Sequence, residues 1–433
     1  MQDKKLHHSD HIQLSTMEYN LIILGAGPGG YRAAEYAAKN GLQVLIIEKS
    51  EVGGTCLNCG CIPTKAWCHE AQRETRDFVL AVEHKNKVVE QLRSGIEQLM
   101  QMPGITLLRG EASFEDAHSI RVGNDVYTAQ HIIIATGSRA KLPPIKGIAG
   151  NSKVVTSTEL LNITEIPQRL AIIGAGVIGM EFASVFQQFG SEVTVTEFLK
   201  ECLPTMDKDI AKRLRKSLEK QGVTFRMNTA VQHIDELDAD LILIATGRSA
   251  NTEGLHLENA DITCGPKGIS VNPETFQVNG KEHIYAIGDV NGQALLAHAA
   301  TMQGIRAVNH ILGKEDHIRF DIMPAAVFTT PEAAGVGITE EQAKEFGINY
   351  TCKKGFYRAN GKALAIGEPE GIVKILADSQ DRLIGCHILG AHAADMVQEI
   401  AALMNMGTTI SQLRDIIHIH PTLSEILQSA AEG

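Results

Sequence analysis

The hydrophobic pattern of the chain contains the same unit twice. Two short apolar runs, residues 21–24 and 170–173, are each followed by a glycine-rich turn and by a stretch of small and apolar residues that predicts a helix. A second short apolar run follows each predicted helix, at residues 44–47 and 193–196. Short apolar runs that alternate with helical stretches are typical of buried parallel strands. The pattern therefore predicts an α/β protein with two similar strand–turn–helix–strand units.

Both turns carry the fingerprint of dinucleotide binding. Each has the spacing G-x-G-x-x-G between a strand and a helix, with an acidic residue about 20 residues further on that can bind a ribose diol. One such turn would be weak evidence, because glycine turns also serve packing, but two complete copies make that explanation improbable. The predicted cofactor contacts are Gly25, Gly27, Gly30 and Glu48 in the first copy, and Gly174, Gly176, Gly179 and Glu197 in the second.

A further segment extends the repeat. Residues 132–137 match residues 243–247, and both predict a buried parallel strand that ends in a turn beside the nucleotide. The turn residues expected there are Thr136, Gly137 and Gly247.

Two dinucleotide sites imply that electrons pass between two nucleotide cofactors. In the second site Glu197 favours the free 2′-hydroxyl of NAD and repels the 2′-phosphate of NADP. Phe198 and Leu199 supply no arginine for such a phosphate, although Lys200 keeps NADP open as an alternative.

The bulk properties narrow the class of protein. A chain of 433 residues suggests two to four domains, and its net charge of -11 argues against general nucleic-acid binding. Its apolar runs are far shorter than the roughly 20 residues of a membrane span. Residues 1–16 have no signal-peptide core and are expected to be a flexible leader or a tag. Eight cysteines without a secretion signal indicate a reducing compartment, and we expect the cytoplasm.

Four of the cysteines, Cys56, Cys59, Cys61 and Cys68, lie within one short stretch. Together with His69 they could bind zinc or an iron–sulfur cluster, but they lack the paired C-x2-C spacing of common zinc sites, and no metal is expected. Four inert thiols are a second alternative. A redox pair is favoured over both, and a place near a helix N-terminus would lower the pKa of Cys56.

Two motifs resemble the class I flavoprotein disulfide reductases. Residues 53–65, which include Cys56 and Cys61, resemble the redox-active segment of that family, and residues 418–425 resemble its H-x-H-P-T-x-S-E signature. The resemblance implies FAD in the first site, NAD(P) in the second, and a disulfide between Cys56 and Cys61 against the flavin. It also implies that His420 is the acid–base catalyst, that Glu425 orients it, and that the protein is a homodimer in which the histidine reaches the partner's disulfide.

The same resemblance assigns further residues and the domains. Lys65 and Glu181 match the family pair near the flavin, although an ordinary salt bridge would look the same; Asp289 matches the flavin-holding aspartate and Ala297 the helix start beneath the flavin. The implied fold class is α/β, with two Rossmann-like domains for FAD and NAD and a C-terminal α+β dimerisation domain. The expected domains are the leader 1–16, the FAD-binding domain 17–148 with 256–320, the NAD-binding domain 149–255 and the dimerisation domain 321–433.

Within the family, the dihydrolipoamide dehydrogenases fit best. Glu197 argues against the NADP-dependent glutathione and trypanothione reductases, and the C-terminus lacks the cysteine pair of mercuric reductases. The expected partner is then a lipoyl-bearing protein of a 2-oxo-acid dehydrogenase complex or of the glycine cleavage system. The alternatives are another NAD(P)H-dependent flavoprotein disulfide reductase, an NADH oxidase on the same scaffold, and a non-catalytic scaffold inside a large acyl-transfer complex. Residues 65–87 and 229–240 look shorter than in the family, and the second suggests a trimmed NAD domain.

Overall fold

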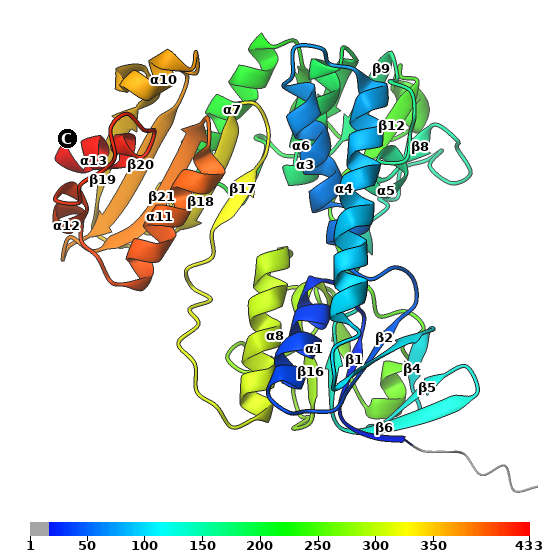
Figure 1. Ribbon diagram of the computed structural model, residues 1–433. Coiled ribbons are helices and arrows are strands. Elements are labelled where there is room, and N and C mark those ends of the chain that lie inside the picture. Colours follow the sequence, from blue (N-terminus) through cyan, green and yellow to red (C-terminus); the bar gives the residue numbers. More distant parts are fainter. Residues whose placement is uncertain (1–16) are drawn as a thin grey trace, which may run out of the picture. The chain divides into compact units, whose positions relative to one another are not determined.

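The computed structural model describes residues 17–433, so the expected leader lies outside the described part of the chain. The described chain divides into two compact units (Figure 1). The first unit contains residues 17–54, 94–138 and 250–316, and the second contains residues 55–93, 139–249 and 317–433. The four-domain division expected from the sequence stays a prediction.

The first unit is built on a sheet whose strands run in the order β3-β2-β1-β6-β5-β4, with β16 also paired to β6. The pairs between β3, β2, β1 and β6 are parallel, as predicted for buried strands. The strands of this sheet are β1 (Met17–Leu24), β2 (Val44–Glu48), β3 (Ile105–Arg109), β4 (Ala112–Phe114), β5 (Ser119–Val122), β6 (Asp125–Ile134) and β16 (Ile284–Ala286). A separate antiparallel pair is formed by β14 (Cys264–Gly265) and β15 (Gly268–Ile269).

Two helices of this unit, α1 (Pro28–Lys39) and α8 (Ala297–Ile311), lie side by side (Figure 1). Their backbones approach closely at glycines: a Cβ added at Gly304 would lie 2.9 Å from the carbonyl oxygen of Gly29. The 3-10 helices η2 (Leu257–Ala260) and η3 (Gly288–Asn291) complete the unit. The long helix α4 (Phe78–Leu99) and the strands β7 (Ser138–Ala140) and β13 (Arg248–Ala250) lie at the unit boundaries.

The second unit contains a parallel sheet of the same design. Its order β11-β10-β9-β12 repeats the order β3-β2-β1-β6, with β8 added at the edge. The internal repeat predicted from the sequence is therefore confirmed. The elements are β8 (Val154–Val155), β9 (Arg169–Ile173), β10 (Glu192–Thr196), β11 (Thr224–Arg226), β12 (Leu241–Ile244), α2 (Gly54–Cys59), α3 (Cys61–Ala71), α5 (Ser157–Leu160), α6 (Val177–Gln188) and α7 (Lys208–Lys220).

The link between β11 and β12 is short and almost without regular structure. Across residues 227–240 it contains the single 3-10 turn η1 (Ile234–Glu236). The buried Ile234 and Ala239 pack this link against Ile242 and Ile244 of β12. The link therefore closes on the sheet by itself, without further strands.

The C-terminal part of the second unit is an antiparallel sheet in the order β17-β18-β21-β20-β19. Lys374 of β20, only 1% exposed, is held by Asp207 at 2.7 Å and Glu340 at 2.6 Å, so the N-terminus of α7 is tied to this sheet by a buried ion pair. The elements are β17 (Ala325–Val327), β18 (Glu332–Gly337), β19 (Tyr350–Phe356), β20 (Ile372–Asp378), β21 (Leu383–Gly390), α9 (Glu340–Glu345), η4 (Tyr357–Ala359), α10 (Gly361–Ala365), α11 (Ala393–Asn405), α12 (Ile410–Arg414) and α13 (Glu425–Glu432).

Candidate active site

The two glycine turns have nearly the same geometry. Gly25 and Gly174 have φ of +104° and +107°, a region that side chains rarely adopt, and a Cβ on either would lie 2.5 Å from a backbone oxygen of the neighbouring strand. The third glycines pack more tightly: a Cβ on Gly30 would lie 1.9 Å from the Gly25 oxygen, and one on Gly179 2.0 Å from the Gly174 oxygen. The glycines at these positions are therefore sterically required.

The acidic residues of the two copies also take equivalent places. Glu48 accepts a hydrogen bond from the Ala26 N–H at 2.7 Å, and Glu197 accepts one from the Ala175 N–H at 2.6 Å. Both side chains are buried; Glu48 is the last residue of β2, and Glu197 follows directly after β10. A carboxylate has about four lone-pair positions, so each can accept a ribose hydroxyl in addition.

The residues present fit two dinucleotides. The N-caps of α1 and α6 are Gly27 and Gly176, which offer no capping side chain to the first amides of their helices. Because glycine has no Cβ, a pyrophosphate can come close to the backbone amides at such a helix start. FAD in the first copy and NAD in the second would be held by these glycines and by the two glutamates.

The two third glycines provide a matched test of the cofactor assignment. We expect Gly30→Ala to purify without flavin absorbance, because its methyl group has no room in the turn below the first nucleotide. Gly179→Ala should keep the flavin but bind NADH at least about tenfold more weakly. Absorbance spectra and NADH titration measure both effects, and a Gly30→Ala protein with a full flavin content would contradict the assignment.

The other predicted contacts of the first unit lie in a connected polar network. Thr136 donates its hydroxyl hydrogen to the Asn251 carbonyl at 2.7 Å, and the Gly137 carbonyl accepts the Asn251 N–H at 2.9 Å. Asp289, in η3, accepts a hydrogen bond from the Ser138 hydroxyl. Ala297 is the first residue of α8, as expected.

Some supporting residues of this network were missed in the sequence. The Gln303 side chain accepts the Gly288 N–H at 2.7 Å and the Asn291 amide at 3.0 Å, which fixes the turn that carries Asp289. A buried glutamine inside a helix gives no local signal, because its partners come from another segment.

The cysteine pair lies where two helices meet. Cys56 is in the first turn of α2, Cys61 is the first residue of α3, and Gly60 stands between the helices. A Cβ on Gly60 would lie 2.8 Å from the Thr55 oxygen and 3.4 Å from the Cys56 Cα, so only glycine lets the chain return this closely. Both cysteines are thiols in the structure and are hydrogen-bonded to each other, the reduced form of the predicted pair.

The expectation for the Cys56 thiol was wrong. The pKa of Cys56 is raised, because its thiol hydrogen bonds to Cys61 and is partly buried. The pKa of Cys61 is instead lowered to about 7, because the bond from Cys56 and the charge of Lys65 outweigh burial and the opposing charge of Glu181. In the reduced pair the thiolate is therefore on Cys61, at the start of α3.

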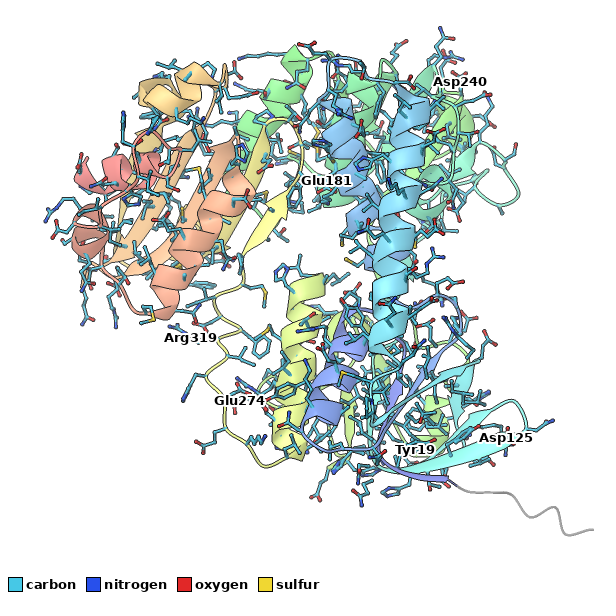
Figure 2. All side chains as sticks on the ribbon, viewed as in Figure 1. Tyr19, Asp125, Glu181, Asp240, Glu274 and Arg319 are labelled. Atoms are coloured by element: carbon cyan, nitrogen blue, oxygen red, sulfur yellow. The ribbon has the colours of Figure 1, made fainter. Side chains whose placement is uncertain are left out.

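Lys65 and Glu181 form the predicted pair between α3 and α6. The Lys65 ammonium lies 2.8 Å from both carboxylate oxygens of Glu181, which also accepts the Phe328 N–H at 2.9 Å (Glu181 is labelled in Figure 2). Burial opposes the charge of Lys65, but Glu181 outweighs it and raises the pKa of the lysine. Lys65 thus stays a cation beside Cys61.

This electrostatic arrangement predicts a pH dependence. In the reduced protein, we expect the rate of Cys61 alkylation by iodoacetamide to rise with pH to half its maximum near pH 7, since the thiolate is the reactive form. Lys65→Met should move the midpoint to higher pH, because it removes the cation. The exposed Lys87→Met on α4 is the matched control and should leave the midpoint in place. A midpoint unchanged by Lys65→Met would contradict the role given to the lysine.

Cys68, the last cysteine of the cluster, is a packing residue. It lies in the hydrophobic core of the second unit, and burial raises its pKa to about 12. Among the described residues, no group of three or more potential ligands is arranged to hold a metal ion.

His420 and Glu425 are paired as the sequence pattern predicted. His420 Nδ1 lies 3.0 Å from the Glu425 carboxylate, which also accepts the Thr422 N–H at 2.8 Å. The His420 side chain is 78% exposed, so Nε2 is available to a substrate or a second subunit. The hydrogen bond from the Thr422 N–H has the largest effect in lowering the pKa of Glu425, and the bond to His420 adds to it. The orienting carboxylate is therefore ionised at neutral pH.

The neighbouring His418 has a different environment. It is buried, with Nδ1 3.0 Å from the Ile416 carbonyl and Nε2 2.8 Å from the Glu399 carboxylate of α11. Both ring nitrogens are therefore engaged, and His418 anchors the loop that carries His420.

The sequence profile of a family described as pyridine nucleotide-disulphide oxidoreductase matches residues 19–304, and the profile of that family's dimerisation domain matches residues 323–431. The chain belongs to this family. As a pyridine nucleotide-disulphide oxidoreductase it is an FAD-dependent enzyme that uses NAD(H), and its fold has the FAD-binding, NAD-binding and dimerisation domains expected from the sequence.

Relatives of this pyridine nucleotide-disulphide oxidoreductase match along nearly its whole length. It is 38% identical to the mitochondrial dihydrolipoyl dehydrogenase of Pisum sativum, over 96% of this chain and 91% of the relative, and 39% identical to the dihydrolipoyl dehydrogenase of Thermus scotoductus, over 96% and 97%. Among solved structures, the HOCl-induced flavoprotein disulfide reductase RclA from Escherichia coli is similar, with a TM-score of 0.90 and 36% identity over 96% of this chain and 99% of that chain.

The alignment lengths agree with a shortened chain. The match to the pea enzyme extends over 457 positions, more than the 433 residues present here, so the relative has residues that this chain lacks.

In the described residues, no helix is long and apolar enough to cross a membrane.

Proposed function

We propose that this protein oxidises dihydrolipoyl groups to the cyclic disulfide and reduces NAD+. The observation that carries this proposal is the Cys56–Cys61 thiol pair with its lowered Cys61 pKa, beside the Lys65 cation. The full-length similarity to proteins named dihydrolipoyl dehydrogenase supports the choice of substrate.

The chain's own residues account for the thiol chemistry. His420 accepts the proton of a substrate thiol at Nε2, because Glu425 holds the ring through Nδ1. The substrate thiolate attacks the Cys56 sulfur of the Cys56–Cys61 disulfide, and Cys61 leaves as a thiolate stabilised by Lys65. The second thiol of the substrate then attacks the other substrate sulfur, which is bonded to Cys56 in the mixed disulfide. The substrate closes to the cyclic disulfide, and Cys56 leaves as a thiol that carries the second proton. FAD, held by Gly25, Gly27, Gly30 and Glu48, would supply the two-electron chemistry that links the reduced cysteine pair to NAD+.

We propose that the enzyme works as a homodimer. The match to a dimerisation domain supports this, and so does the loop around His420. Ile417 and Ile419 on that loop are 95% and 78% exposed in the single chain, which is unfavourable for two neighbouring isoleucines in water. Burial of this loop against a second copy would bring His420 toward the other subunit.

The protein partner is proposed from the substrate. A lipoyl group reaches such an enzyme on a carrier, which we propose is the lipoyl-bearing protein of a 2-oxo-acid dehydrogenase complex or of the glycine cleavage system. We also propose a cytoplasmic location for the protein.

A second candidate function is that of a reductase for another disulfide or oxidant, which the similarity to RclA favours. Two assays on one preparation separate the candidates: NAD+ reduction by dihydrolipoamide, and NADPH consumption with glutathione disulfide. The proposal expects the first to be fast and the second near background. A flavin spectrum that dihydrolipoamide does not bleach would contradict the proposal.

A further inference from the structure

Cys59 is a half-buried thiol that the proposed reaction does not use. It is the last residue of α2, three positions after Cys56, so the helix carries a C-x-x-C motif on one turn. Residues three apart lie on the same face of a helix. Cys56 therefore has two cysteine neighbours: Cys61 across the Gly60 break, and Cys59 within its own helix.

The backbone permits a bridge inside α2. Two residues three apart in an α-helix have Cα atoms about 5 Å apart, within the range of about 4.4–6.8 Å found for disulfides. Their Cβ atoms, about 5–6 Å apart in a regular helix, must approach by about 1–2 Å. Cys59 is at the C-terminal end of α2, where the chain already leaves helical geometry at Gly60, with φ of -150° and ψ of -115°.

We propose that Cys59 is a third redox cysteine, which exchanges with the active disulfide to form a Cys56–Cys59 bridge. This inference rests on the proposed function, because it requires the Cys56–Cys61 disulfide. The Cys59 thiol loses its proton to water, and its thiolate attacks the Cys56 sulfur. The Cys56–Cys59 bond forms, the Cys56–Cys61 bond breaks, and Cys61 leaves as a thiolate. The exchange consumes no external oxidant or reductant.

The surroundings favour this exchange. Cys61 is the better leaving group, because the positive charge of Lys65 stabilises its thiolate. Asn58, between the two helical cysteines, accepts a hydrogen bond from Arg93 of α4 at 3.0 Å, which holds the turn that presents Cys59. Cys68 is excluded as a rival, because it is buried in the core and has a raised pKa.

The exchanged form has a defined chemical consequence. Cys61 is a free thiolate, and Cys56 is bridged to Cys59. The electron pair of a substrate dithiol then no longer arrives at Cys61, so this form does not turn over until the bridge returns. Since a thiolate attacks in both directions, the change is reversible, and its rate rises with pH.

The test follows the label on each cysteine of the oxidised holoenzyme. The enzyme is held at mildly alkaline pH without added thiol, labelled with iodoacetamide under denaturing conditions and digested, and the peptide spanning Cys56–Cys61 is sequenced by mass spectrometry. We expect about a tenth or more of the bridged peptide to carry the label on Cys61, with Cys56 and Cys59 joined. Thiol treatment should remove this species.

Two variants make the test specific. Cys59→Ser should never show a bridged peptide labelled on Cys61, whereas Cys68→Ala, which removes a thiol outside α2, should show the wild-type pattern. A wild-type bridge found only between Cys56 and Cys61, with the label on Cys59 at all times, would overturn this inference and leave the proposed function intact. Labels on all three cysteines, with no bridge, would overturn both.

Discussion

Replacing Cys61 with serine is expected to lower the rate of dihydrolipoamide oxidation by about 1,000-fold or more, a loss typical of removing a reacting group. The reason is that Cys61 is the thiolate of the reduced pair, and the Cys56–Cys59 bridge proposed above does not turn over. Electron transfer from NADH to a dye needs the flavin and the second nucleotide site but no disulfide, so it should persist. Both rates are measured on one preparation with a known flavin content.

The outcome of this experiment separates chemistry from structure. If Cys61→Ser loses its flavin together with both activities, the segment serves mainly to hold the fold. If dihydrolipoamide oxidation survives, the disulfide mechanism is wrong. Cys68→Ala is a suitable control, because that thiol is buried and has a raised pKa.

Replacing His420 with glutamine is expected to lower kcat for dihydrolipoamide by about 100- to 10,000-fold, the usual contribution of a general acid–base group. Glutamine can still hydrogen-bond to Glu425 but cannot take the thiol proton. The NADH-to-dye activity and the flavin content should be unchanged, because this step involves the substrate thiol alone. Steady-state kinetics with dihydrolipoamide measure the loss.

Two companion variants limit the interpretation. Glu425→Gln should cost less, about tenfold, because it weakens the orientation of His420 without removing the base. His418→Gln should act through the loop and should therefore reduce thermal stability along with activity, since His418 is buried against Glu399. If His420→Gln and His418→Gln lost the same activity with dihydrolipoamide, His420 would act by supporting the loop and not by transferring the proton.

The link between β11 and β12 is short and contains a single 3-10 turn, η1. Residues 227–240 pack on the sheet through Ile234 and Ala239, and the glycine turn and Glu197 of the same domain have the geometry of the first copy. The trimmed NAD domain suggested by the sequence stays a prediction, and it leaves the nucleotide-contacting elements intact.

The parts of the site that depend on local steric rules could be predicted from sequence. Gly25, Gly30 and Glu48, and their counterparts in the second copy, meet requirements that act within one turn and the strand beside it. Such requirements appear in the sequence as residues at fixed spacing. The strands and helices of the two repeated units, and the repeat itself, were therefore predicted correctly. The His420–Glu425 pair was implied by the family resemblance, and the structure brings the two side chains together.

The parts that depend on distant segments needed the structure. Glu181 is 116 positions from Lys65, and the sequence suggested this pair only by resemblance. The need for glycine at position 60 appears only once the chain has turned back on Thr55.

By itself, therefore, the sequence indicated two nucleotide-binding units and a cysteine pair, and its resemblance to the family implied a histidine oriented by Glu425. The tertiary structure decided which cysteine carries the negative charge: Cys61, and not Cys56 as expected. The physical reason is that the charge on a thiol depends on its hydrogen bonds and on the distance to charges such as Lys65 and Glu181, which folding brings together and spacing along the chain does not encode.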